Sequence, residues 1–351
     1  MSALSQPRAR RPFGAARDVV NGIVAVGVKE LRGRMRGRRA FVVLTIHLLL
    51  VAGFAWMVES FAERTVTSNF GSTFSASADI GRALFTGLML LLTLIVLVLA
   101  PASTAGAISL EREKQTLDLL ATTPISSLAI VLGKLLSALT WVFLLLAASI
   151  PVTALVFTFG GVGPEDVVRG YVVLLGTAIG FGAIGLFVSA LVKRTQAATV
   201  INLVTVITLT VGTTIVFIFW TAMTGSQGFL PDQPGGVRDQ GLLASLTRRP
   251  PEALMYLNPF VAQLDVVCGT ETGFGTTCQV ISGVTARDLA NVGFDEAQFG
   301  VARDSFWPRS LIAMGVTSLL LIVLSVQLVS PTRRWRLRLP RPRRRPAGSD
   351  A

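Results

Sequence analysis

Six long tracts of the chain consist mainly of apolar residues and contain no aspartate, glutamate, lysine or arginine. A helix needs about 20 residues, at about 1.5 Å each, to cross the hydrocarbon core of a bilayer. Isolated strands are excluded, because a segment in lipid must satisfy its backbone hydrogen bonds internally. The pattern therefore predicts an all-α polytopic membrane protein with six transmembrane helices. The tracts are Ala40–Val58, Ala83–Leu110, Leu135–Gly160, Gly170–Val192, Thr195–Trp220 and Ser310–Thr332.

Composition agrees with this pattern, since 51% of the residues are hydrophobic and only 15% are charged. Most of the 32 basic residues lie before the first tract, after the last one, or in the connections between tracts two and three and between tracts four and five. The positive-inside rule places these segments, and with them both termini, in the cytoplasm. We expect the basic tails to contact anionic lipid headgroups, and no nucleic acid is needed to explain the charge.

The charge pattern divides the chain into successive segments. Apolar residues at three- and four-residue steps before the first tract predict an amphipathic helix in the membrane surface, or else the solvated start of a longer first span. The first outer connection, Glu59 to Arg82, reads as a short polar loop. The segments are a disordered basic N-terminus at 1–15, an interfacial helix at 16–38, five spans within 39–220 with a cytoplasmic coupling segment at 108–134, an extracytoplasmic region at 221–309, a sixth span at 310–332 and a basic cytoplasmic tail at 333–351.

The fourth tract contains small residues at Gly176, Gly180, Gly185 and Ser189. Small residues at such spacing allow membrane helices to approach closely, although the pattern is weak in a glycine-rich chain. It marks either a helix interface or no more than a glycine-rich composition.

The large extracytoplasmic insertion between spans five and six is too long to be one passive connection. Within it, Pro250–Val267 predicts one or two short helices, interrupted or kinked at Asn258-Pro259. They either dip into the outer leaflet or form an external cap on the bundle. Cys268 and Cys278 follow, and they either form a disulfide on the oxidising side of the membrane or remain two thiols.

The segment between tracts two and three is the most informative one. Glu111, Arg112, Glu113 and Lys114 place mixed charge where the second span leaves the bilayer. A short leucine cluster follows, and the chain is then broken at Pro124 before the helix that continues into the third span. A short amphipathic element between two membrane helices can transmit a push from a docked protein to both of them.

The run Glu111-Arg-Glu-Lys-Gln-Thr-Leu-Asp-Leu-Leu-Ala-Thr-Thr-Pro-Ile-Ser126, followed by Leu132-Gly133-Lys134, resembles the permease signature of type-2 ATP-binding-cassette (ABC) transporters. That signature has Glu-Arg-Glu, a small residue, Gly-Thr-Leu-Glu and a leucine-rich turn into proline. The chain departs from it at Gln115, where glycine is common, and at Asp118, where glutamate is common. The six-span layout, the helix before the first span and the elaborated region before the sixth also resemble that family.

The resemblance implies a permease subunit of an ATP-driven exporter in a bacterial inner membrane, paired with a second permease copy or a paralogue and with ABC ATPase subunits. The chain itself would be no enzyme and would carry no cofactor, with ATP and magnesium on the partner ATPase. The chain has no Gly-x-x-x-x-Gly-Lys-Ser/Thr motif of its own. The implied ATPase contact consists of Glu111, Arg112, Glu113, Thr116, Leu117, Leu120 and Pro124.

Other chemistry finds little support in the sequence. His47, the single histidine, lies midway along the first tract, where an ionisable residue is either functional or hydrogen-bonded to a neighbouring helix. No ligand spacing predicts a metal site. Two alternatives remain: an integral membrane enzyme with an extracytoplasmic active site built on the carboxylates of 221–309, or a non-transporting membrane subunit that drives an external partner.

Overall fold

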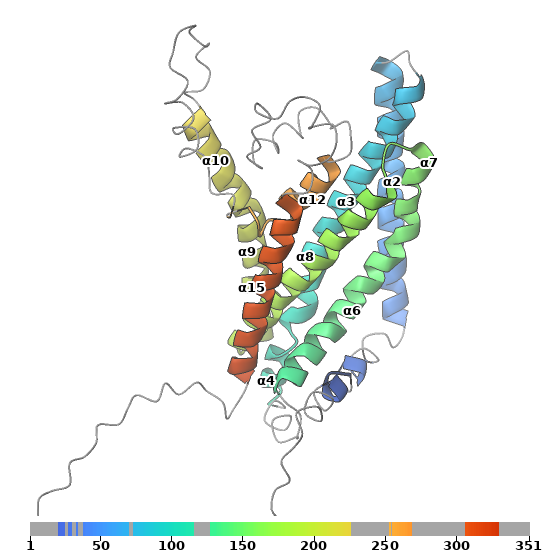
Figure 1. The fold of residues 1–351 in the computed structure, drawn as a ribbon. Coiled ribbons are helices and arrows are strands. Elements are labelled where there is room, and N and C mark those ends of the chain that lie inside the picture. The colour runs from blue at the N-terminus through green and yellow to red at the C-terminus, as the bar shows by residue number, and fades with distance from the viewer. Residues whose placement is uncertain are drawn as a thin grey trace, which may run out of the picture.

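The fold of the computed structural model is a bundle of helices, and no strand occurs among the residues that it describes (Figure 1). Those residues are 20–24, 27–29, 33, 38–69, 73–115, 127–225, 253, 255–268 and 306–329. Within these ranges six helices are long and apolar enough to cross a membrane, which confirms the all-α polytopic prediction. The candidate spans are Ala40–Arg64, Ser77–Glu113, Ser127–Phe159, Pro164–Leu191, Thr195–Phe219 and Phe306–Val329.

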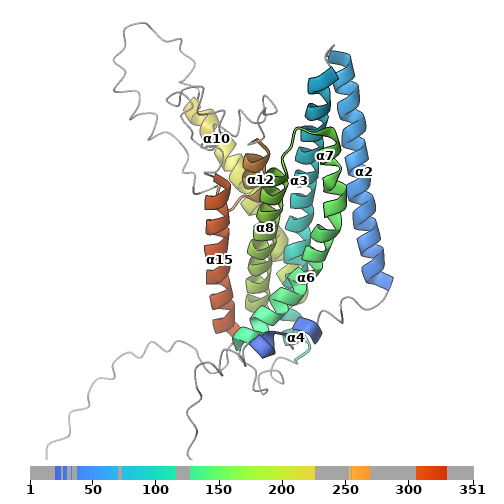
Figure 2. The same ribbon diagram turned by 45° about the vertical axis from the view of Figure 1, so that its right-hand side comes forward.

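The spans are made up of several helical segments. They are α2 (Arg38–Asn69), α3 (Thr73–Ala105), α4 (Ser109–Glu113), α6 (Ser127–Ala154), α7 (Val156–Phe159), α8 (Pro164–Leu191), α9 (Thr195–Ile207), the π-helical turn η1 (Thr208–Gly212), α10 (Thr213–Gly225), α12 (Pro259–Cys268) and α15 (Phe306–Val329). Figures 1 and 2 show α4 at one end of the bundle, beside the start of α6 and the end of α15, with α7, α10 and α12 toward the other. We call these the α4 end and the α12 end.

The helix α8 lies at the centre of the bundle and packs against both α3 and α15. Gly176 faces the side chain of Leu311 on α15, while Gly185 lies against the backbone of Pro101 on α3. A side chain at either glycine would collide with that neighbour, so the small residues do mark helix interfaces. Two helices can therefore approach α8 more closely than ordinary side chains would allow.

Several helices begin earlier or end later than the charge-free tracts. The α6 helix starts at Ser127, so that Lys134 is inside the helix rather than at its edge. The predicted polar loop from Glu59 to Arg82 is wrong, because α2 continues to Asn69 and α3 already begins at Thr73. The two helices pack on each other there and bury Ala62 and Ile80. Charged residues on the outer faces do not stop a helix whose inner face is packed.

The α12 helix packs against α3, α8 and α15, and most of its side chains are buried. One or two short helices, interrupted or kinked at Asn258-Pro259, were predicted here; in the structure a turn at 255–257 precedes Asn258 and the helix begins at Pro259. Proline suits the first helical position, because no backbone N–H is needed there. The choice between insertion into the outer leaflet and an external cap stays a prediction. Cys268 ends α12 and Cys278 lies outside the described residues, so the disulfide stays a prediction.

The two tails, 1–15 and 333–351, also lie outside the described part of the chain. Residues 20–24 and 27–29 of the predicted interfacial helix are helical. The remaining boundaries of that segment stay predictions.

Candidate functional site

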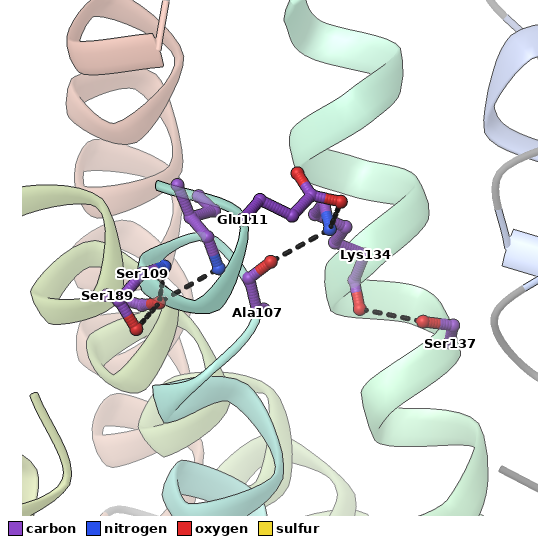
Figure 3. Close-up of polar contacts among 7 residues, drawn as sticks. Ala107, Ser109, Glu111, Lys134, Ser137 and Ser189 are labelled. Carbon is purple, nitrogen blue, oxygen red and sulfur yellow. Dashed lines mark hydrogen bonds and ion pairs between the residues drawn. The ribbon is translucent and has the colours of Figure 1, made fainter. Parts of the chain in front are cut away.

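The coupling segment predicted from the sequence begins where α3 ends at Ala105. A turn leads into α4, whose first backbone N–H groups have no partner within the helix. The Ser189 hydroxyl of α8 accepts hydrogen bonds from the backbone N–H groups of Ile108 and Ser109, both at 3.0 Å (Figure 3). Ser189 is fully buried. The start of α4 is therefore anchored to the central helix of the bundle.

Glu111 of α4 is bound to α6 through Lys134 (Figure 3). The Lys134 ammonium lies 2.8 Å from Glu111 Oε1 and donates to the backbone oxygen of Ala107, also at 2.8 Å. The Lys134 side chain is only 3% exposed, while that of Glu111 is 25% exposed. A buried ammonium needs such partners, because the loss of water is otherwise uncompensated. The pair therefore ties α4 to α6 at the boundary of the apolar core.

Glu113 binds the start of α9. Its Oε2 atom accepts hydrogen bonds from the Thr195 hydroxyl at 2.8 Å and from the Thr195 backbone N–H at 3.3 Å. The residue before α9, Arg194, provides no side-chain cap of its own. A carboxylate is favourable at this position, because the N-terminal end of a helix carries partial positive charge. Glu113 thus serves α9 as a cap supplied by another helix.

Arg112 contacts the C-terminal end of a helix, whereas Glu113 contacts an N-terminal end. Its Nη2 atom donates to the backbone oxygen of Leu328, at 3.4 Å, in the last turn of α15. The last carbonyl groups of a helix have no partner within the helix and carry partial negative charge. The contact is long for a hydrogen bond, but it has the sign that the helix end favours.

Three consecutive charged residues of α4 therefore bind three different spans: Glu111 binds α6, Arg112 binds α15 and Glu113 binds α9. The start of α4 binds α8, and the helix continues directly from α3. Five of the six candidate spans in the described ranges are thus connected to a helix of five residues. Leu110 and Glu113 of this helix remain exposed, as do Lys114 and Gln115 directly after it.

The backbone conformation at Gln115 shows how the chain tolerates one departure from the permease signature. Its φ is 56°, in the left-handed region that favours glycine. Glycine is common at this position of the signature, and the residue directly after a helix frequently adopts this conformation. The chain keeps the backbone geometry although it lacks the glycine.

The structure describes only part of the predicted contact. Glu111, Arg112 and Glu113 lie together on α4, whereas Thr116, Leu117, Leu120 and Pro124 lie outside the described residues. The sequence placed Lys134 at the end of the coupling segment but not among the contact residues, and it did not assign Ser189 to this site. Lys134 stands alone among apolar residues in the sequence, which indicates that it has a buried partner. Ser189 was considered only as a small residue for helix packing.

His47 of the first span donates one hydrogen bond to the backbone of α6. Its Nε2 atom lies 3.1 Å from the backbone oxygen of Leu145 on α6, and because a carbonyl only accepts, Nε2 carries the proton. The ring is 7% exposed. This is the hydrogen-bonded arrangement between neighbouring helices, and the geometry gives His47 a structural contact.

The described residues hold no group of three or more His, Cys, Asp or Glu side chains that could bind a metal ion. Asp265 belongs to the region predicted to be extracytoplasmic, and its Oδ2 atom accepts a hydrogen bond from the backbone N–H of Trp307 at 3.1 Å. It thereby caps the first turn of α15. The other carboxylates considered for an enzyme site between spans five and six lie outside the described part of the chain.

A bundle of six apolar spans makes the chain a multi-pass membrane protein. The model of the ABC-2 family transporter proteins matches residues 24–267, and the chain belongs to that family. It is a permease subunit of an ABC transporter, a class whose ATPase is a separate partner. A comparison with the curated proteins found no match.

Proposed function

We propose that the chain is the membrane-spanning subunit of an ATP-driven exporter that works by alternating access. The observation that carries this proposal is the connection of α4 to α6, α8, α9 and α15 through Glu111, Ser189, Glu113 and Arg112. A partner that displaces α4 displaces several spans together, because each contact joins α4 to a different helix. Few roles other than the transmission of force would need contacts between one short segment and so many helices.

The docking surface is the exposed part of the same segment. Leu110 is 43% exposed, and Glu113, Lys114 and Gln115 are exposed as well. Thr116, Leu117, Leu120 and Pro124 extend this surface in the proposal. The carboxylate of Glu111 already binds Lys134, so its role is to transmit force from the docked ATPase into α6.

The α4 end faces the cytoplasm in this proposal, and the membrane is the bacterial inner membrane. The support comes from the basic residues, since Lys114, Lys193 and Arg194 all lie at connections of this end. ATP and magnesium bind to the partner ATPase, which is therefore reached from the same side.

A second permease, identical or related, completes the transporter in this proposal. Apolar side chains along α2 and along α9 to α10 are exposed in the single chain, among them Phe41, Leu49, Val204 and Ile215. Such faces contact either lipid or another membrane helix. Pairing across some of them would enclose a path between the two permeases.

Co-purification with the ATPase tests the proposal. The full chain is expressed with the ABC ATPase encoded beside it, and the ATPase bound to the purified permease is measured. Lys114→Glu and Leu117→Asp should reduce bound ATPase at least tenfold, because they reverse a charge or place one in the docking surface. Glu165→Lys is the matched control, since it reverses an 81% exposed charge on α8 at the α12 end.

The proposal fails if no ATPase binds, or if both docking variants bind it as the unchanged chain does. ATP-dependent efflux from cells or vesicles then separates an exporter from a non-transporting subunit. Retained ATPase binding without any ATP-dependent transport would favour the non-transporting role.

A further inference from the structure

The fifth span is interrupted in its middle by the π-helical turn η1, Thr208–Gly212. Before the turn, α9 packs against α3, α4 and α8. After it, Phe217 is the one buried side chain among those of α10 that the structure describes. Figures 1 and 2 both show α10 leaning away from the rest of the bundle. Such π-turns are rare within helices and frequently mark functional positions.

Asn258, from the segment just before α12, binds this turn directly. Its Nδ2 atom lies 3.0 Å from the backbone oxygen of Thr210 and 3.0 Å from each of the hydroxyl oxygens of Thr213 and Thr214. Asn258 is fully buried. The two N–H groups of one amide thus serve a cluster of three acceptors in the interior of the protein.

The orientation of the amide follows from its other end. Asn258 Oδ1 accepts the backbone N–H of Phe260 at 3.1 Å, so it caps α12. Only the oxygen can accept that bond, and Nδ2 must therefore face the threonines. One side chain caps α12 and also holds η1, which joins two segments 48 residues apart.

The segment around α12 is bound to the sixth span as well. Ser310 of α15 donates from its hydroxyl to the backbone oxygen of Tyr256, at 2.6 Å. Asp265 caps the first turn of α15 through Trp307. Leu257, next to Asn258, lines a small apolar cavity with residues of α8, η1 and α15, including Phe181 and Met314.

We propose that Asn258 is the positioning residue of a hinge in the fifth span, and that it couples the η1–α10 half of that span to α12. The bundle holds α9 before the turn, whereas Asn258 connects the half after it to α12, which packs on α3, α8 and α15. A motion of α10 then also moves Leu257 relative to its cavity. The hinge is a property of the chain alone and does not depend on the proposed export.

Hydrogen–deuterium exchange of the full chain in lipid nanodiscs tests the hinge. Asn258→Ser keeps a good cap for α12, because serine and asparagine cap equally well, but its side chain is too short to reach the threonines. Amide exchange in both α10 and α12 should rise about tenfold, the change that corresponds to about 1.4 kcal/mol. Exchange in α3 and α8 should stay unchanged.

A second variant acts from the other side of the contact. Thr214→Val removes an acceptor without a large change of volume, and exchange in α10 and α12 should rise about threefold. Thr205→Val is the matched control on α9, because the Thr205 hydroxyl donates to the backbone oxygen of Ile201 within its own helix. Amide exchange in α10 and α12 should not change in this control variant.

Combining Asn258→Ser with Thr214→Val should raise exchange no further than Asn258→Ser does, because both remove the same contact. The inference is wrong if Thr214→Val leaves α10 and α12 unchanged, or if α10 alone responds. If Asn258→Ser raises exchange in every helix, it has destabilised the whole fold. The result for Thr214→Val then decides whether the inference holds. Loss of ATPase binding in the docking variants has no bearing on this result.

Discussion

At each end of the bundle a short segment is bound to several spans, but the side chains that bind it differ between the two ends. At the α4 end a short helix is bound to several spans by charged side chains, among them Glu111 and Lys134. At the α12 end a short segment is bound by neutral groups, the amide of Asn258 and the hydroxyl of Ser310, together with one carboxylate, Asp265. Both segments hold neighbouring spans together at one end of the bundle.

The position along the span explains the difference. Glu113 is exposed at the end of its helix, where water can stabilise the charge. Asn258 instead reaches Thr210, in the middle of the fifth span, where an unpaired charge would be expensive. Among the described residues, the ion pairs Arg82–Asp79, Lys134–Glu111 and Arg169–Glu165 lie near the bundle ends, whereas amide and hydroxyl groups make the contact at the middle of the fifth span.

The first way to break this comparison is to remove the ammonium at the α4 end. Lys134→Met should destabilise the chain by about 3 kcal/mol, because it leaves the Glu111 carboxylate without its partner. The double variant Lys134→Met, Glu111→Gln should recover much of the loss, since no charge then remains. Thermal unfolding in nanodiscs measures both. A single variant as stable as the unchanged chain would show that the pair contributes little.

A second test compares a central helix with a peripheral one. Gly185→Ala on α8 should destabilise by about 1–3 kcal/mol, because the added carbon meets the backbone of Pro101 and the hydroxyl of Thr104. Gly53→Ala on α2 has no heavy atom within 4 Å of the added carbon. It should be neutral or slightly stabilising, since alanine has the higher helix propensity. Equal effects in unfolding experiments would contradict the close packing of α8 on α3.

The helix caps at the two ends sharpen the comparison further. Asp265→Ala removes the buried cap of α15 and should destabilise by about 1–2 kcal/mol. Glu113→Ala removes the exposed cap of α9 and should destabilise the chain less than Asp265→Ala does, because water can replace the lost acceptor. Local exchange in the first turns of α15 and α9 reports each loss separately. A larger effect at Glu113 would reverse the expected role of burial.

The smallest expected effect concerns the end of α4. Gln115→Gly should stabilise that turn by less than about 1 kcal/mol, because glycine adopts the left-handed backbone conformation without strain. Gln115→Val should act in the opposite direction, since a β-branched residue tolerates a φ of 56° poorly. Exchange rates of the α4 amides distinguish the two variants. An unchanged α4 in both would mean that the turn is held entirely by its contacts to the spans.

The spans were predictable because their signal is local. A charge-free stretch of sufficient length depends on the residues of that stretch and on the thickness of a bilayer, and on nothing elsewhere in the chain. The signature around Glu111 was similarly readable as a run of neighbouring residues. The helix ends were less predictable: α2 packs on α3 and runs through Glu59 to Asn69, beyond the charge-free tract.

The contacts of the two short segments needed the tertiary structure. Lys134 and Glu111 are 23 residues apart, and Asn258 and Thr210 are 48 apart. Their meeting depends on how each helix is rotated and on which helices are neighbours, which hydrophobic periodicity does not specify within apolar spans. The amino-acid sequence by itself therefore determined the six spans and the likeness to a permease, and it predicts their sidedness through the positive-inside rule. The tertiary structure alone decided which polar side chains connect the spans, because those bonds form only where packing brings distant helices together.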